Sequence, residues 1–228
     1  MLNFLYTILI YPVYLFVEFI FFTANIIADG NIGISIVLLS IGINIICLPM
    51  YNVAEQWQEK ERTIQKRMKS KITDIKAVFK GDERYLMLST YYRQNNYHSL
   101  YALRSMFALF IQIPFFIAAY KLLSDSSVME KSSFLFFTDL DAPDKLFNLG
   151  NISINVLPVV MTLINIAASA VYTKGLELKD KLTLYITALI FLVLLYNSPT
   201  GLVFYWTLNN IFSLLKNIFY KIKLKKER

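Results

Sequence analysis

The sequence predicts an all-α polytopic membrane protein with five transmembrane helices. Of its 228 residues, 56% are hydrophobic and only 17% are charged, whereas an average soluble domain is roughly 25% charged. The apolar residues form runs of about the length that crosses a ~30 Å hydrocarbon core. Most of the basic residues lie between these runs, and the first of them is Lys60. This placement favours membrane topology over DNA binding as the reason for the net charge of +7.

Five apolar stretches are long enough to span the bilayer. Each should be helical, because lipid offers the backbone amides and carbonyls no other partner. The fourth stretch covers only roughly 24 Å at the helical rise, which favours local thinning of the bilayer. The stretches are residues 33–50, 101–123, 154–172, 182–197 and 201–219.

The charges of the loops predict the orientation of the chain. Residues 51–100 carry ten Lys or Arg residues, whereas residues 124–153 carry five acidic residues and two lysines. The positive-inside rule therefore places the first of these loops in the cytoplasm. The basic tail at residues 220–228 agrees with this orientation, so we expect a cytoplasmic C-terminus.

Residues 1–30 form an apolar N-terminal segment in front of the membrane core, which comprises residues 31–228. The segment is long enough to span the bilayer, but it contains Pro12 and Glu18 and has no basic residue to hold a cytoplasmic end. We expect an interfacial helix on the outer face, with an additional spanning helix as the alternative. Because no basic n-region precedes the apolar run, we expect it to be retained rather than cleaved.

Residues 51–100 predict a helical hairpin. Apolar residues recur at spacings of three, four and seven between Trp57 and Phe79, with charged and amide residues between them. Gly81-Asp82 offers a stop and a turn. A shorter second helix follows, with its apolar side formed by Tyr85, Leu86, Leu88, Tyr91 and Tyr92.

The residue types favour a function without catalysis. The only histidine, His98, lies next to a helix start, and the five predicted spans contain no Asp or Glu. The only cysteine, Cys47, lies in an apolar run and cannot form a disulfide or a cysteine-based metal site. We therefore expect no enzyme activity, no metal and no cofactor.

Polar side chains inside the predicted spans indicate interhelical hydrogen bonds or a partly hydrated groove. Hydrogen bonds between spans are worth about 0.6–2 kcal/mol each. Their number in this sequence favours the groove. The candidate groove residues are Asn44, Ser40, Gln112, Asn165, Ser169, Thr207 and Asn209.

The order of these parts resembles the YidC family of membrane protein insertases, within the YidC/Oxa/Alb superfamily. The likeness covers nearly the whole core, in order and with similar spacing. The segments that carry it are Tyr11-Pro12, Gly33 to Pro49, Gln112-Ile113-Pro114, Phe136-Phe137-Thr138-Asp139-Leu140, Leu157-Pro158, Ser198 to Trp206, and Asn209-Asn210.

The resemblance implies a membrane protein insertase or chaperone in the bacterial cell (inner, cytoplasmic) membrane. A hydrophilic groove open to the cytoplasm would receive polar parts of nascent or newly made membrane proteins, without nucleotide hydrolysis. Ribosome or translocon contacts are further implied partners, and anionic lipids are expected at the basic tail. The hairpin residues that would contact clients are Trp57, Ile64, Met68 and Tyr91.

The sequence departs from this family at Asn44, where the typical insertase has an arginine five residues before the proline. An arginine at mid-membrane costs about 2.5–3.5 kcal/mol on insertion, so asparagine removes both that cost and an attraction for acidic client tails. Ser169 stands where many members have a glutamine, and Arg104 offers either a substitute charge or a topological anchor.

The alternative function is a dedicated assembly or scaffold partner of one membrane protein, for instance an envelope-biogenesis enzyme. A transporter would need inverted repeats that the sequence does not show.

Overall fold

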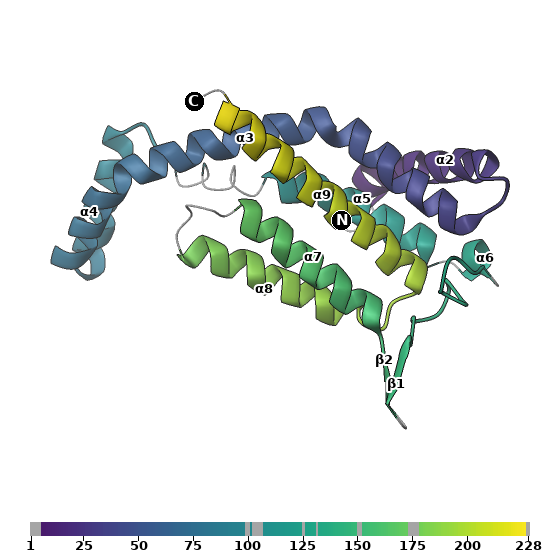
Figure 1. The fold of residues 1–228 in the computed structure, drawn as a ribbon. Coiled ribbons are helices and arrows are strands. Elements are labelled where there is room, and N and C mark those ends of the chain that lie inside the picture. The colour runs from purple at the N-terminus through teal and green to yellow at the C-terminus, as the bar shows by residue number, and fades with distance from the viewer. Residues whose placement is uncertain are drawn as a thin grey trace. The chain divides into compact units, whose positions relative to one another are not determined.

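The computed structural model describes residues 6–98, 101, 107–124, 126–130, 132–149, 152–172 and 178–226. The chain divides into two compact units, one formed by Met1–Ile46 with Phe115–Arg228 and the other by Cys47–Pro114. The described chain is mostly helical, as the sequence predicts (Figure 1).

Three of the predicted spans coincide closely with helices of the first unit. These helices are α7 (Val156–Tyr172), α8 (Leu178–Leu195) and α9 (Thr200–Lys226). Helix α7 packs against both α8 and α9, so it lies at the centre of this group (Figure 1). The predicted span at residues 101–123 corresponds to α5 (Phe107–Leu123), and its first residues include some outside the described ranges.

The first predicted span continues into the hairpin as one helix, α3, which runs from Ile32 to Val78. The sequence places the span at residues 33–50 and starts the hairpin at residue 51, and the structure joins the two in one continuous helix. A proline removes one backbone hydrogen bond and disturbs the carbonyl four residues earlier. Residues 50–78 contain no further proline and no glycine, so the helix resumes after this local disturbance.

The N-terminal segment forms a π-helical turn, η1 (Tyr6–Ile10), and then α2 (Tyr11–Ile27). The Asn25 side chain on α2 accepts a hydrogen bond from the Ser35 hydroxyl, near the start of α3, at 3.1 Å. Further back along α2, the Tyr14 ring lies 4.7 Å from the Lys121 Nζ, near the end of α5. Helix α2 therefore contacts the ends of two other helices.

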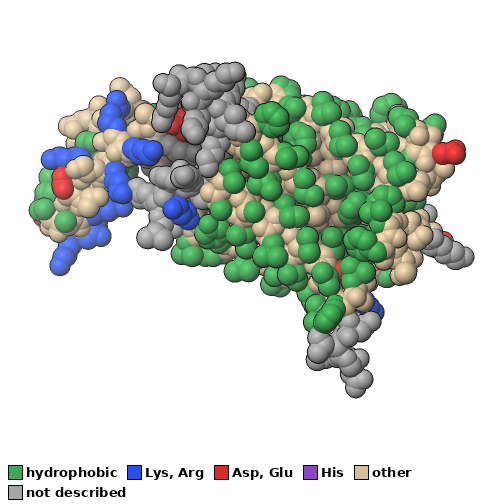
Figure 2. Space-filling view, viewed as in Figure 1, with side chains coloured by type: hydrophobic (Ala, Val, Ile, Leu, Met, Phe, Trp, Pro, Cys, Tyr) green, Lys and Arg blue, Asp and Glu red, His purple; other side chains and the backbone are tan. Residues whose placement is uncertain are grey.

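Length and hydropathy separate the described helices into two groups. Two helical stretches, Thr7–Ile27 and Ile32–Val78, are long and apolar enough to cross a membrane, while Ile111–Leu123, Val156–Val171 and Leu184–Leu195 are shorter apolar helices. Hydrophobic side chains cover the visible face of the first unit (Figure 2). Large apolar residues are exposed on α8, where Val193 is 79% exposed. A surface of this kind is typical of contact with a membrane or with another protein.

The loop between α5 and α7 packs onto the starting ends of α3 and α9. The Phe134 ring occupies the space beside Gly33, and a Cβ there would lie 1.9 Å from it. Met129 fills the corresponding space beside Gly201, whose amide donates to the Leu140 carbonyl at 2.9 Å. We call this arrangement the loop cap. Its close contacts leave no room for a Cβ at Gly33, and a Cβ at Gly201 would displace the Met129 side chain.

The same loop contains short elements that the sequence analysis did not predict. They are α6 (Ser126–Met129) and a two-stranded antiparallel ribbon, β1 (Phe147–Leu149) with β2 (Ile152–Ile154). Strands of three residues are too short to show an alternating pattern in the sequence.

The second unit contains the predicted hairpin, formed by the latter part of α3 and by α4 (Gly81–Gln94). The turn lies just before the predicted position, because Gly81, with φ of +56°, already begins α4. Met68 is 1% exposed, whereas Tyr85 is 75% exposed and Leu86 is 64% exposed, so the predicted apolar side of α4 is not covered at these two positions by the described residues. Helix α4 contains no buried residue among those described.

Candidate functional site

A cluster of buried polar side chains joins α3 to α9 inside the first unit. The Ser40 hydroxyl donates to the Asn209 side-chain oxygen at 3.1 Å, and the Asn44 amide donates to the same oxygen. The Asn44 amide also donates to the Ser40 carbonyl at 2.8 Å. All three residues are at most 8% exposed. The structure thus brings three predicted groove residues into one hydrogen-bonded cluster.

Helical spacing explains why these side chains meet. Ser40 and Asn44 are four residues apart and therefore lie on one face of α3. Asn44 lies about 18 Å along α3 from Ile32, and Asn209 about 14 Å along α9 from Thr200, at the usual rise. The cluster therefore lies well inside both helices, where lipid offers no hydrogen-bond partner.

A second polar pair joins α7 to α9. The Asn165 amide donates to the Asn210 side-chain oxygen at 3.0 Å. Two turns further along α9, the Asn217 amide donates to the Ala168 carbonyl at 3.3 Å. Asn210 is 6% exposed, whereas Asn165 is half-buried. Polar contacts therefore run along the seam between α7 and α9.

The remaining predicted groove residues are placed differently. The buried Thr207 hydroxyl donates to the Val203 carbonyl of its own helix at 2.7 Å. Ser169 is half-buried on α7, one turn after Asn165. Gln112 is half-buried and belongs to the second unit.

The four hairpin residues predicted to contact clients differ in exposure. Trp57 is 44% exposed and Met68 is 1% exposed. Ile64 and Tyr91 are half-buried. Trp57 is thus the member of this set that is available at the surface, while Met68 lies inside the hairpin.

A hydrogen bond closes the base of the hairpin. The Tyr97 hydroxyl, which follows α4, donates to the Glu61 Oε1 at 2.5 Å, and Gln65 donates to the same oxygen at 2.9 Å. Burial raises the pKa of Tyr97 to about 12, and the hydrogen bond to Glu61 contributes further. The neutral phenol is therefore the form that this contact favours.

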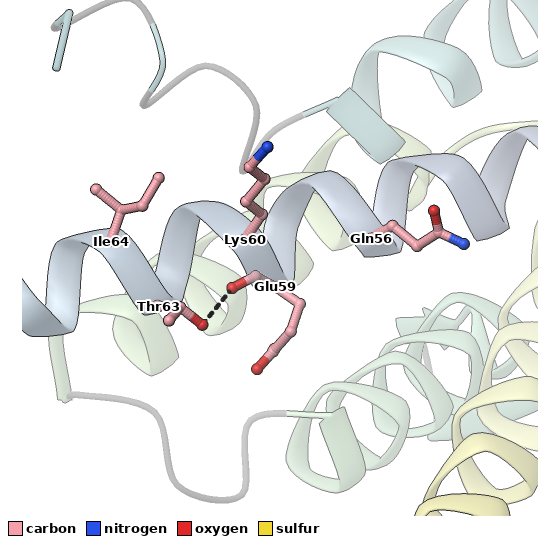
Figure 3. Close-up of a pocket in the computed structure, with 5 residues that line it drawn as sticks. All are labelled: Gln56, Glu59, Lys60, Thr63 and Ile64. Carbon is pink, nitrogen blue, oxygen red and sulfur yellow. Dashed lines mark hydrogen bonds between the residues drawn. The ribbon is translucent and has the colours of Figure 1, made fainter. Parts of the chain in front are cut away.

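Among the described residues, a shallow hollow on α3 is lined from one side only. It is lined by Gln56, Glu59, Lys60, Thr63 and Ile64, all from neighbouring turns of one helix (Figure 3). The Thr63 hydroxyl donates to the Glu59 carbonyl at 2.9 Å, so it is already satisfied within the helix. Residues from one helix face do not surround a small ligand on several sides.

Metal-binding side chains do not gather in the part of the chain that the structure describes. Within those ranges no three His, Cys, Asp or Glu residues lie close enough to hold a metal ion. Cys47 is fully buried in α3.

Sequence reasoning missed Asn217 and the Glu61–Tyr97 contact, and it did not include Asn210 among the candidate groove residues. The helical spacing from Asn210 to Asn217 offered a signal, because residues seven apart share a face. No local signal pairs Glu61 with Tyr97, which are 36 positions apart. Arg104 lies outside the described residues, as do the side chains of the basic tail.

Comparisons with known proteins agree on one family. The family model described as 60Kd inner membrane protein matches residues 22–227. The chain is 28% identical over 223 residues to the membrane protein insertase YidC of Aquifex aeolicus (strain VF5), covering 97% of this chain and 40% of that protein. It is 29% identical over 204 residues to the membrane protein insertase YidC of Herminiimonas arsenicoxydans, covering 86% and 34%, respectively. The chain therefore spans well under half the length of these relatives.

The fold also matches a solved structure. The crystal structure described as an active YidC insertase with the first transmembrane domain resolved superposes with a TM-score of 0.58 at 22% identity. The match covers 90% of this chain and 45% of that one. At this identity the likeness shows the fold alone. The sequence match over almost the whole chain shows the family, and the chain therefore belongs to the YidC family of inner membrane proteins.

Proposed function

We propose that this protein is a membrane protein insertase or chaperone that releases hydrophobic client segments into the bilayer without hydrolysing a nucleotide. The carrying observation is the set of polar side chains deep within α3, α7 and α9, in a chain of the YidC family. Such groups lower the barrier for polar parts of a client, because they replace some of the hydrogen bonds that water would make.

The contacts of Asn44 define its role in this proposal. Its amide is shared between Ser40 and Asn209, so it ties α3 to α9 and adds no charge. A neutral groove attracts acidic client tails less than a groove with an arginine, because it offers no Coulombic attraction. We therefore expect clients whose transferred segments are short and uncharged.

The proposed topology has five spans, a cytoplasmic hairpin and a cytoplasmic C-terminus in the bacterial inner membrane. Helix α2 is the proposed interfacial helix on the outer face. Tyr14 and Asn25 lie about 16 Å apart along α2, and they contact the ends of α5 and α3, respectively. Because α2 contacts the end of α5 and the start of α3, we place it across the ends of these two helices. Client proteins, anionic lipids and a ribosome or translocon are the proposed partners.

A dedicated assembly partner of one membrane protein is the second candidate. The observation that favours it is that the Ser40–Asn44–Asn209 cluster is closed and buried, as expected of a structural tie. Photo-crosslinking from position 44 separates the two functions. An insertase yields many newly made chains, whereas an assembly partner yields one folded protein.

The main test is rescue of a bacterial strain depleted of its general insertase. We expect weak or no rescue by the chain as it stands and better rescue by Asn44→Arg. Asn44→Gln is the matched control, because it adds length without charge. Full rescue by the unaltered chain would establish a general insertase, and failure of every variant would favour the assembly partner.

A further inference from the structure

Two buried nitrogen donors on α9 have no hydrogen-bond partner among the described residues. They are the indole Nε1 of Trp206 and the amide Nδ2 of Asn210. Trp206 is 4% exposed and Asn210 is 6% exposed. Buried polar groups of this kind are rare in folded proteins and call for an explanation.

The two donors lie on the same face of one helix. Residues four apart on a helix are stacked one turn above the other, with an axial separation of about 6 Å. Carbonyls on the same side of an extended chain repeat every second residue, at about 6.6–6.8 Å. The axial spacing of the two residues therefore suits two successive acceptors of an extended polypeptide.

We propose that Trp206 and Asn210 bind the backbone carbonyls of an extended client segment while it passes between the helices. This site rests on the proposed insertase function. It differs from the Ser40–Asn44–Asn209 cluster, in which the Asn44 amide and the Ser40 hydroxyl are already bonded.

Trp206 and Asn210 contact neighbouring helices through ring packing and one neutral hydrogen bond among the described residues, and a client could replace these contacts. The Trp206 ring lies 4.6 Å from the Phe116 ring of α5 and stacks at 5.0 Å on the Phe191 ring of α8. Asn210 is held by Asn165 of α7 through one hydrogen bond. Separation of α9 from these helices therefore breaks ring contacts and one neutral hydrogen bond while it uncovers both donors.

The first experiment observes the indole N–H directly. The chain has two tryptophans, and the indole resonance that Trp206→Phe removes is that of Trp206. In lipid nanodiscs, ¹⁵N-indole-labelled protein is mixed with a synthetic peptide that carries one apolar span and an unstructured polar tail. We expect the N–H resonance to move downfield with this peptide and to stay in place with a peptide that lacks the tail. A downfield resonance without any peptide would mean that water or a lipid carbonyl holds the donor, and this would overturn the proposal.

The second experiment removes each donor and measures the peptide affinity. Trp206 is replaced by 3-benzothienylalanine, which keeps the bicyclic ring and replaces the N–H by sulfur, and Asn210→Leu removes the amide. Each change should raise the dissociation constant about five- to tenfold, as loss of one hydrogen bond does. Thr162→Val is the control, because the Thr162 hydroxyl donates to the Pro158 carbonyl of its own helix at 2.8 Å.

Crosslinking from position 44 distinguishes failure of this site from failure of the proposed function. If the peptide crosslinks at position 44 and the Trp206 resonance does not move, the site is wrong and the insertase function stands. If the peptide crosslinks nowhere and binds no variant, both proposals are wrong.

Discussion

Asn44 on α3 donates its side-chain amide to the side-chain oxygen of Asn209 on α9, 165 positions later in the chain. The same oxygen accepts the Ser40 hydroxyl at 3.1 Å. One acceptor therefore satisfies donors from two consecutive turns of α3. Its loss leaves both donors without this partner in a region where lipid supplies none.

Replacement of Asn209 by leucine should destabilise the protein by about 1–2 kcal/mol, because two buried donors lose their shared acceptor. The measurement is reversible unfolding in bicelles. Thr207→Val is the control and should change stability little, because the Thr207 hydroxyl bonds within its own helix. A double-mutant cycle with Asn44→Leu should reveal coupling between the two positions, and strict additivity would contradict the contact.

Gly33→Ala should destabilise the loop cap by about 1–3 kcal/mol, as overpacking commonly does. The added Cβ would lie 1.9 Å from the Phe134 ring, so the loop must move. Gly42→Ala in the same helix is the matched control, because its Cβ would meet Ile20 at an ordinary 3.5 Å. Thermal unfolding of the two variants measures the difference. Equal stability would show that the loop does not press on Gly33.

The base of the hairpin should open at high pH. The pKa of Tyr97 is raised to about 12, above an ordinary value of about 10. The contact with Glu61 therefore contributes its full stability below pH 10 and loses it as the pH rises towards about 12. Spin labels at Thr63 and Asn96, both exposed, should show a distance distribution that broadens over this interval.

Tyr97→Phe provides the control for this titration. It should give a broad distribution at every pH, because the bond to Glu61 is absent. The Tyr92 ring lies 5.4 Å from the Tyr97 ring, centroid to centroid. Persistence of the same pH response in Tyr97→Phe would therefore assign the opening to another group.

Cysteine labelling should distinguish the two orientations of α2. The background is Cys47→Ser, and single cysteines replace Ile8 and Ile26, which are 57% and 83% exposed. An interfacial helix leaves both positions reactive with an impermeant thiol reagent applied from outside. A spanning helix leaves the two positions on opposite sides, and protection of Ile8→Cys from outside would support it.

The sequence predicted the long apolar helices well, because lipid restricts a spanning backbone to a helix and the apolar runs mark its extent. It did not show that α3 continues as one helix past Pro49, because a proline disturbs a helix without always ending it. The ribbon formed by β1 and β2 was missed because its strands have only three residues each.

The candidate polar residues could be predicted from their positions in apolar runs, but their partners could not. Asn209 and Asn210 are neighbours in sequence, and helical geometry turns their side chains about 100° apart. One contacts α3 and the other contacts α7. Only the arrangement of the helices determines which asparagine meets which partner.

The loop cap holds three helices of the first unit together at one end. It fastens the starting ends of α3 and α9 through Phe134, Met129 and the Leu140 carbonyl. Asp144 in the same loop accepts a hydrogen bond from the Leu157 amide at the start of α7, at 2.7 Å. Three helices fastened at one end separate most readily at the other, as the arms of a pair of tweezers do. In the proposed insertase, a client segment therefore enters and leaves between the helices at this free end.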